Sequence, residues 1–302
     1  MPKYRIAHLS DPHLPPPKGA FGWRDLFTKR LLSRIAWRRK RHVHRPEVLA
    51  MLIADLKAAA PDHVVISGDL TNFASHTEIA AARKWLESLG SPDEITVSPG
   101  NHDALVGQGG AERFAPWTPW LGDAGEAVFP QIRVRGPAAI FNLSSARPTA
   151  PHLATGRLGE AQLGRLDAAL ADPAYAQLFR IVALHHPPHE GAVSGRKALE
   201  DRAALRAILA RRGADLVLHG HAHEPLVGTI PGPDDTIIPV LGVPSASARS
   251  SGHAPARWHA IEIDLQPDGE RRVRIVARGL EPGADAVKEL GRYRLADVSA
   301  RG

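Results

Sequence analysis

The sequence predicts an α/β protein, and three observations support this class. Short apolar runs rich in β-branched residues alternate with longer segments of helical periodicity, which is the pattern of β-α-β units. The apolar content of 43% and the charged content of 23% are typical of globular chains. A length of 302 residues allows one large domain with a buried core or two small domains. Because no linker interrupts the pattern, we expect one domain.

In the first half of the chain, each expected strand is a short apolar run. Each expected helix repeats apolar residues at every third or fourth position. A strand over 4–9 precedes a basic helix, which lies in an insert at about 18–45. The next elements are a helix over 47–60, a strand over 64–67, a helix over 78–89 and a strand over 95–98.

The second half begins in the same way and then becomes entirely strand-like. We expect a strand over 138–143, a helix over 160–170, a strand over 180–184, a helix over 199–211 and a strand over 216–218. Beyond Gly220, turns with Pro, Asp and Gly separate four strands, over 226–230, 237–241, 259–265 and 273–277. We therefore expect a domain over residues 1–280 and a C-terminal tail, 281–302, without a clear pattern.

Positive charge is concentrated in the insert at 18–45. This segment contains ten Lys and Arg and a single acidic residue, Asp25. Phe27, Leu31 and Ile35 recur at positions i, i+4 and i+8, which predicts an amphipathic helix with a cationic face. Two interpretations stay open: a helix packed on the domain with its basic face in solvent, or a helix that lies on an anionic membrane.

The composition limits both the chemistry and the location of the protein. The chain has no cysteine, so disulfide bonds are excluded and any metal must be held by His, Asp, Asn or Glu. No apolar run approaches the roughly 20 residues that span a bilayer, and the N-terminus shows no signal-peptide core. We therefore expect a soluble, cytoplasmic protein. Its net charge of +6 favours anionic partners.

Five motifs place polar side chains just after apolar, strand-like runs. Because open α/β folds build their sites at the carboxyl ends of strands, we expect these side chains to meet. Asp69 can bridge two metals with its two carboxylate oxygens, and His221 and His223 can face two neighbouring metals or chelate one. The motifs are Asp11-Pro12-His13, Gly68-Asp69, Gly100-Asn101-His102-Asp103, His185-His186-Pro187 and Gly220-His221-Ala222-His223.

The motif at 100–103 is more specific than the two before it. The side-chain oxygen of Asn101 can ligate a cation, whereas His102 need not ligate and can act as an acid. Asp103 is placed to orient that histidine, as carboxylates commonly do. Of the consecutive histidines His185 and His186, we expect one to be a ligand and the other to support it.

Together these motifs resemble the signature of the calcineurin-like metallophosphoesterases, and the resemblance covers residues 7 to about 224. It implies a four-layer αββα sandwich of two mixed β-sheets flanked by helices. It also implies hydrolysis of P–O ester bonds by in-line attack of a hydroxide that bridges two cations roughly 3.5–4 Å apart. The mixed nitrogen and oxygen ligands are compatible with Mn, Fe, Zn, Co or Ni.

The resemblance also assigns a role to each site residue. Asp69 would bridge the two metals, and His102 would donate a proton or hydrogen bond to the leaving oxygen, a contribution of roughly 10²–10⁴-fold. Asp103 would be the partner of His102. One metal would be bound by Asp11, His13, Asp69 and His223, and the other by Asp69, Asn101, His185 and His221. Because no ligand position is missing, the non-catalytic scaffold members of the family are disfavoured.

The predicted function is that of a phosphodiesterase, because the motifs are most similar to the bacterial cyclic-nucleotide and glycerophosphodiester phosphodiesterase branch. The basic insert suggests another enzyme, a membrane-associated phospholipid or nucleotide-lipid pyrophosphate hydrolase similar to the lipid-A precursor pyrophosphatases. Two alternatives are not enzymes: a metal-dependent scaffold, and a nucleic-acid-binding protein, which is disfavoured because no binding motif is present. The substrate, the native metals and the oligomeric state stay open.

We expect the other histidines and two tryptophans to have structural roles. Trp117 and Trp120 are assigned to the core or to loop packing. His8, His186 and His219 can support the metal ligands. The following histidines are assigned to the surface or to packing: His42, His44, His63, His76, His152, His253 and His259.

Overall fold

A computed structural model describes residues 3–40, 42–107, 111–249, 253–265 and 271–295. Residue 41 of the basic insert and residues 296–302 of the expected tail lie outside the described residues. The strands are β1 (Tyr4–Leu9), β2 (His63–Ile66), β3 (Ile95–Val97), β4 (Gln131–Arg135), β5 (Ala138–Asn142), β6 (Phe179–Ala183), β7 (Leu216–His219), β8 (Leu226–Pro231), β9 (Ile237–Gly242), β10 (Arg257–Leu265), β11 (Arg271–Gly279) and β12 (Lys288–Arg294).

Six α-helices and five short 3-10 helices connect the described strands. The α-helices are α1 (Lys29–Lys40), α2 (Pro46–Ala58), α3 (His76–Leu89), α4 (Thr118–Leu121), α5 (Glu160–Ala171) and α6 (Arg202–Arg212). The 3-10 helices are η1 (Trp23–Phe27), η2 (Pro92–Glu94), η3 (Ala111–Trp117), η4 (Pro173–Tyr175) and η5 (Gly195–Lys197). Within the described residues, no helix is both long and apolar enough to cross a membrane.

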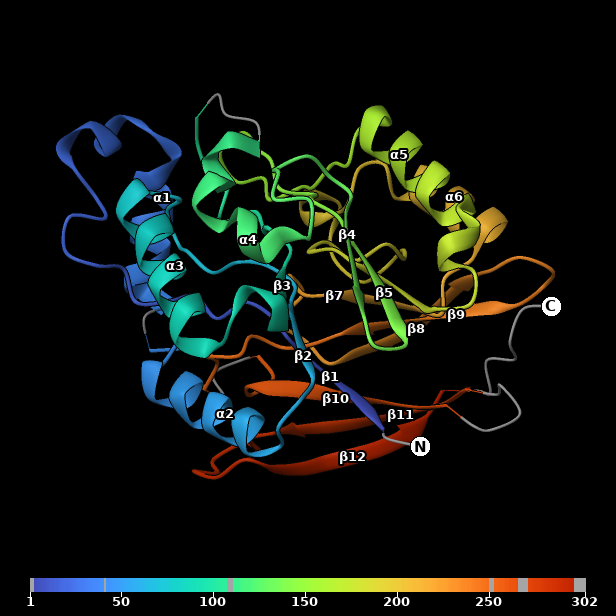
Figure 1. The fold of residues 1–302 in the computed structure, drawn as a ribbon. Coiled ribbons are helices and arrows are strands. Elements are labelled where there is room, and N and C mark those ends of the chain that lie inside the picture. The colour runs from blue at the N-terminus through green and yellow to red at the C-terminus, as the bar shows by residue number, and fades with distance from the viewer. Residues whose placement is uncertain (1–2, 41, 108–110, 250–252, 266–270, 296–302) are drawn as a thin grey trace.

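The first sheet has the strand order β12-β11-β10-β1-β2-β3 (Figure 1). β1, β2 and β3 run parallel, with Leu9 opposite Ile66 and Ile66 opposite Val97. β10, β11 and β12 extend the sheet beside β1 by antiparallel pairing. The carboxyl ends of β1, β2 and β3 therefore lie side by side at one edge.

The second sheet has the order β4-β5-β6-β7-β9-β8. Its central strands β5, β6, β7 and β9 run parallel, and β4 and β8 are antiparallel strands at its two edges. Ala183 of β6 is opposite Leu218 of β7, so these two strands also end beside each other. Both sheets are mixed, as predicted.

The two sheets pack face to face, and helices cover their outer faces (Figure 1). Ile6 and Val65 of the first sheet share one fully buried apolar cluster with Ile181 and Leu218 of the second. α2 and α3 pack on the first sheet through another cluster, and α5 and α6 pack on the second. Burial of apolar faces on both sides of each sheet produces the predicted four-layer αββα sandwich.

Two strands at the sheet edges were not predicted. β12 lies within the segment 281–302, which showed no pattern, and yet it pairs with β11 along its length. Its side chains are exposed or half-buried, so the alternation of apolar and polar residues that marks a half-buried strand is absent. β4 is likewise an edge strand. The first sheet thus continues beyond residue 280, where the predicted domain boundary lies.

Candidate metal centre

Five parallel strands from the two sheets bring the predicted site residues together. Hydrogen bonds join the two sheets here. His185 Nδ1 donates to the Ser67 carbonyl at 2.7 Å, and His221 N donates to Asp11 Oδ2 at 3.0 Å. The residues that follow the strands are Asp11 and His13 after β1, Asp69 after β2, Asn101 and His102 after β3, His185 after β6, and His221 and His223 after β7.

The backbone is strained at five of the candidate ligands. In a residue other than glycine, a positive φ costs about 1–2 kcal/mol and persists only where the surrounding structure enforces it. Backbone hydrogen bonds from Asp11 to Gly68 (2.9 Å) and from His13 to Asp69 (3.1 Å) enforce it here. The five residues are Asp11 (φ 52°), His13 (41°), Asp69 (56°), His221 (66°) and His223 (57°). Such concentrated strain is characteristic of functional sites.

Asp11, His13 and His223 form one group of candidate ligands, whose ligand atoms all lie within 4.8 Å of one another. His223 Nε2 is 3.0 Å from Asp11 Oδ1, and His13 Nε2 is 3.9 Å from the same oxygen. His13 Nε2 is also 3.9 Å from Asp69 Oδ2. Because metal–ligand bonds are about 2.0–2.2 Å long, ligand atoms at these separations can share one cation.

Asp69, His185 and His221 form a second group of candidate ligands. His185 Nε2 lies 3.3 Å from Asp69 Oδ2 and 3.1 Å from Asn101 Oδ1. The other ring nitrogen of His185 is engaged by a carbonyl, so Nε2 is the atom free to ligate. In His221, Nε2 lies 2.9 Å from the Lys197 carbonyl, so Nδ1 is the ring nitrogen that is free to ligate a metal. The grouping matches the implied ligand sets, and the metal-binding role itself stays a prediction.

Two glycines allow the loops of the site to approach each other closely. A Cβ at Gly220 would overlap Ser10 Oγ and lie 2.5 Å from Asp11 Oδ2. A Cβ at Gly100 would overlap the carboxylate of Asp69. Any larger residue at either position would therefore displace a candidate ligand.

The buried carboxylates make this part of the protein strongly attractive to positive charge. Burial alone would raise the pKa of Asp11, but neighbouring His223 and His185 hold it below its ordinary value. Burial alone would lower the pKa of His185, but Asp69 and Asp11 raise it to about 9. A proton or a metal cation is therefore strongly favoured between these carboxylates.

The remaining histidines are suited to bind metals as neutral ligands. Burial, and then the neighbouring histidines, hold the pKa of His13 and His221 well below the usual value, which keeps their ring lone pairs free of protons. Both ring nitrogens of His13 are buried without a hydrogen-bond partner among the described residues. Such atoms call for an explanation, and a cation provides one. Nitrogen and oxygen donors of this kind fit divalent transition metals.

The structure corrects the predicted role of Asp103. His102 Nδ1 lies 3.0 Å from the Asn72 carbonyl, which therefore orients the ring. The carboxylate of Asp103 instead accepts three hydrogen bonds of 2.9 Å, from the backbone N–H groups of Asp69, Thr71 and Gly100. The prediction that Asp103 orients His102 is wrong. The carboxylate of Asp103 is occupied by these three backbone N–H groups, and it thereby connects the loop after β2 to the loop after β3.

A cavity of about 190 Å³ lies over both candidate ligand groups. His102 lines this cavity, as does Lys197 from η5. The basic insert also contributes to the wall, through Ser33, Ala36 and Trp37 of α1. Part of the cavity wall is therefore formed by the basic insert, a segment in which the sequence pattern indicated no site residue.

His44 and His253 also line the cavity, although both were assigned to the surface or to packing. The ring of His44 lies 4.4 Å from that of His13, between centroids, and the ring of His253 lies 6.0 Å from that of His223. Neither residue directly follows a strand, so the signal that identified the other site residues was absent. By contrast, Trp117 and Trp120 are buried in the core as predicted.

Residues 4–225 match the family described as calcineurin-like phosphoesterase. The chain therefore belongs to this family, and it is a metal-dependent phosphoric ester hydrolase. One curated relative is a probable cyclic nucleotide phosphodiesterase from Synechococcus sp. It is 30% identical over 233 residues, which cover 75% of this chain and 80% of the relative.

Two solved structures share the fold. A dimetal phosphatase from Danio rerio matches with a TM-score of 0.53 and 13% identity, over 95% of this chain and 98% of that one. A purple acid phosphatase from yellow lupin (Lupinus luteus) seeds matches with a TM-score of 0.54 and 13% identity, over 92% of this chain and 52% of that one. At this level of identity the comparisons support the architecture alone.

Proposed function

We propose that this protein is a phosphodiesterase that uses two divalent metal ions and hydrolyses a diester such as a cyclic nucleotide. The observation that carries the proposal is the position of Asp69, whose Oδ2 faces His13 on one side and His185 on the other, at 3.9 and 3.3 Å. One carboxylate thus borders both candidate ligand groups. This arrangement supports a shared, binuclear centre.

Each residue of the centre has a definite task in this proposal. The first metal would be held by Asp11, His13, Asp69 and His223, and the second by Asp69, Asn101, His185 and His221. Bound in this way, two cations supply an activated water and stabilise the charge that develops on the ester oxygens. His102 donates from Nδ1 to the Asn72 carbonyl, so in the doubly protonated ring Nε2 carries the proton that would pass to the leaving oxygen.

Two observations favour a diester over a monoester. The curated relative that covers most of this chain is itself a probable phosphodiesterase. The cavity also extends beyond the candidate ligands to Trp37 and Lys197, which provides a surface for a second esterified group.

Complete ligand sets favour an enzyme over a metal-dependent scaffold. Hydrolysis of a lipid-linked pyrophosphate is the second candidate, and the basic insert favours it.

The proposal is tested by removing the metals with a chelator and restoring Mn²⁺. We expect activity to vanish and to return with about two ions bound per chain, because there are two candidate ligand groups. The restored enzyme should hydrolyse bis-p-nitrophenyl phosphate faster than p-nitrophenyl phosphate, and a cyclic nucleotide should compete with the diester. Turnover of neither ester under several metals would reject the proposal.

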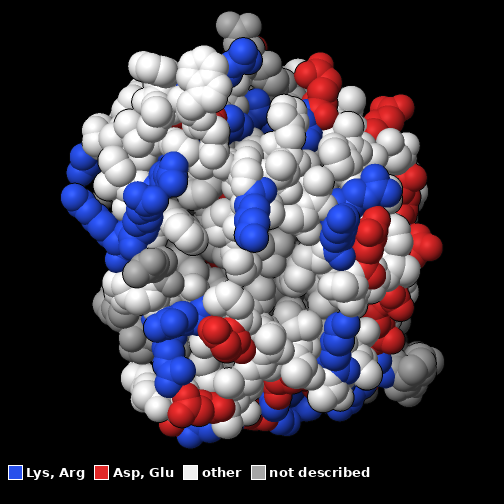
Figure 2. Space-filling model, turned by 90° about the vertical axis from the view of Figure 1, so that its left-hand side faces the viewer, with Lys and Arg blue, Asp and Glu red and all other residues white. Residues whose placement is uncertain are grey.

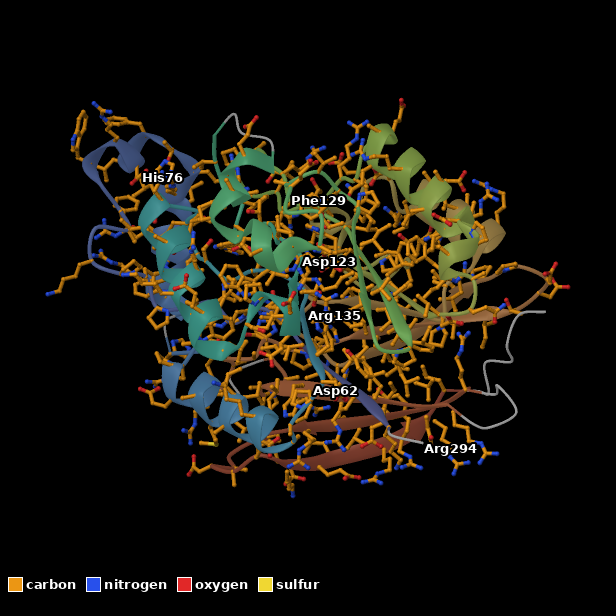
Figure 3. All side chains as sticks on the ribbon, viewed as in Figure 1. Asp62, His76, Asp123, Phe129, Arg135 and Arg294 are labelled. Carbon is orange, nitrogen blue, oxygen red and sulfur yellow. The ribbon has the colours of Figure 1, made fainter. Side chains whose placement is uncertain are left out.

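Variants of each ligand group separate metal loss from unfolding. His13→Ala and Asn101→Ala should each bind about one ion, and their activity should fall by more than the roughly 10–100-fold typical of residues that only support a ligand. His76→Ala is the matched control, because His76 (labelled in Figure 3) is an exposed residue at the start of α3 and belongs neither to a candidate ligand group nor to the cavity lining. Full activity in either ligand variant would show that the assignment is incorrect.

A further inference from the structure

The basic insert carries an unusual concentration of exposed apolar side chains. Nine large hydrophobic residues are exposed among the described residues, and five of them lie between positions 23 and 35. These five are Trp23 (70% exposed), Leu26 (48%), Phe27 (84%), Leu32 (39%) and Ile35 (42%). We call this set the apolar patch. Contiguous exposed apolar surface commonly marks an interaction site.

The orientation of α1 is the reverse of the one expected for a helix packed through its apolar side. Lys29 Nζ donates to Thr149 Oγ1 and to the Leu153 carbonyl, both at 2.6 Å. Arg30 donates to the carbonyls of Phe73 (2.8 Å) and Ala74 (2.7 Å). These two cations fasten the insert to the domain, and the apolar patch stays exposed, whereas Leu31 and Trp37 are half-buried. Leu32 and Ile35 therefore lie outside the surface through which α1 contacts the domain.

Four arginines accompany the apolar patch and have no salt bridge to any described carboxylate. Arg24 lies over the Trp23 ring and Arg34 over the Phe21 ring, with guanidinium carbons 5.4 and 4.2 Å from the ring centroids. Arg38 and Arg39 are exposed at the end of α1. Figure 2 shows this side of the molecule, where Lys and Arg surround uncharged residues and acidic side chains lie mainly toward the right and lower edges.

We propose that residues 23–39 of the basic insert dock on an anionic lipid bilayer. Exposed Trp, Phe, Leu and Ile can enter the boundary between headgroups and acyl chains, as the apolar face of an interfacial helix does. The four arginines lack carboxylate partners among the described residues and complement the negative headgroups. A bilayer satisfies both features at once, whereas an apolar protein surface would leave the arginine charges without partners.

Docking would place the lipid surface close to the catalytic cavity. The side of α1 opposite Leu32 and Ile35 contributes Ser33 and Trp37 to the cavity wall. An α-helix with its side chains is about 10–12 Å across, so one helix diameter would separate the bilayer from the cavity. The insert would thus hold the enzyme where an ester presented by a membrane, or released from it, can enter.

The test is sedimentation of the full chain with vesicles of equal parts phosphatidylglycerol and phosphatidylcholine, compared with pure phosphatidylcholine. We expect binding to the anionic vesicles that weakens as salt rises, because the Debye length shortens from about 10 Å at 0.1 M to about 3 Å at 1 M. Trp23→Ser with Phe27→Ser should weaken binding on the order of tenfold or more. Arg38→Gln with Arg39→Gln should weaken it about fivefold per arginine.

The matched control replaces two apolar residues that are equally exposed elsewhere. Val227→Ser with Ile237→Ser changes side chains that are 69% and 64% exposed on β8 and β9, and it should leave vesicle binding unchanged. All variants should keep wild-type hydrolysis of bis-p-nitrophenyl phosphate, which shows that they fold. Vesicle binding is measured without turnover of any substrate. The membrane proposal can therefore fail while the proposed function stands, and the proposed function can fail while the membrane proposal stands.

Two results would overturn the membrane proposal. One is equal sedimentation with anionic and neutral vesicles that no patch variant alters. The other is a concentration-dependent dimer in analytical ultracentrifugation that Trp23→Ser with Phe27→Ser dissolves, together with no vesicle binding. In that case the apolar patch would be an interface between two copies of this chain.

Discussion

His102 is held in place by a backbone carbonyl rather than by a carboxylate. Its Nδ1 binds the Asn72 carbonyl at 3.0 Å, and its backbone N–H donates to Asp69 Oδ1 at 2.7 Å. The first contact orients the ring, and the second ties the residue to the candidate bridging carboxylate. In our proposal the doubly protonated ring of His102 donates from Nε2, and the residue is not a metal ligand.

We predict that His102→Ala lowers kcat by roughly 10²–10⁴-fold, the usual contribution of a general acid. The loss should be largest for a diester with an alkoxide leaving group and smaller for one that releases p-nitrophenolate, which needs less protonation. Metal content should stay at the wild-type level, because the ring is outside both ligand groups. Equal losses with both leaving groups would contradict the role of proton donor.

At the scale of elements, the loops after β2 and β3 form one unit centred on Asp103. Its carboxylate binds three backbone N–H groups, two from the loop after β2 and one from the loop after β3. Burial, and then the charge of Asp69, raise the pKa of Asp103 to about 7. Asp103 acts on the site through the backbone of these loops and does not contact the reacting atoms in our proposal.

We predict that Asp103→Asn weakens metal binding and lowers the free energy of unfolding by roughly 1–3 kcal/mol, because an amide NH₂ group would face a backbone donor. Its activity should recover when Mn²⁺ is raised, since the substitution loosens the ligands without removing one. A Mn²⁺ titration of activity, combined with thermal unfolding, measures both effects. His102→Ala is the comparison, because excess Mn²⁺ should not restore it; a lack of recovery in Asp103→Asn would argue for a direct catalytic role.

The elements that were predicted correctly are those with strong local patterns. The apolar runs at β1, β2, β6 and β7 are fully or mostly buried, so their composition alone distinguishes them from loops. β12 escaped prediction because an edge strand with exposed side chains has no such pattern. The orientation of α1 could not be predicted for a related reason. Periodicity shows that a helix has an apolar and a polar face, and it does not show which face contacts the domain.

At the scale of the whole molecule, the four layers bury several histidines, and burial disfavours the charged form of each imidazole. His63 of β2 lies 2.8 Å from Thr96 Oγ1 of β3 through its Nε2. Burial, followed by Arg133 and Arg135, lowers its pKa to about 3. Burial likewise lowers the pKa of His186, His219 and His259. The folded state therefore keeps these histidines neutral, whereas the unfolded chain protonates them near pH 6.5.

We predict that the protein loses stability as the pH falls below about 6.5. Between that value and the folded pKa of about 3, the unfolded state binds one more proton at His63, which costs roughly 1.4 kcal/mol of stability per pH unit. His63→Gln should remove this single contribution and make the pH dependence of the unfolding free energy shallower by that amount. Urea unfolding between pH 4.5 and 7 measures the slope, with exposed His76→Gln as control; equal slopes would contradict the prediction.

The sequence by itself determined the α/β class and the strands that deliver the candidate site, because strongly apolar runs mark these strands and parallel strands end at one edge of a sheet. The resemblance of the motifs to a known family then named each candidate metal ligand, such as His185 rather than His186. Only the tertiary structure decided that Asn72 rather than Asp103 orients His102, that His44 and Trp37 line the cavity, and that the apolar patch of the insert faces solvent. These features depend on contacts between segments far apart in the chain, and local sequence carries no record of such contacts.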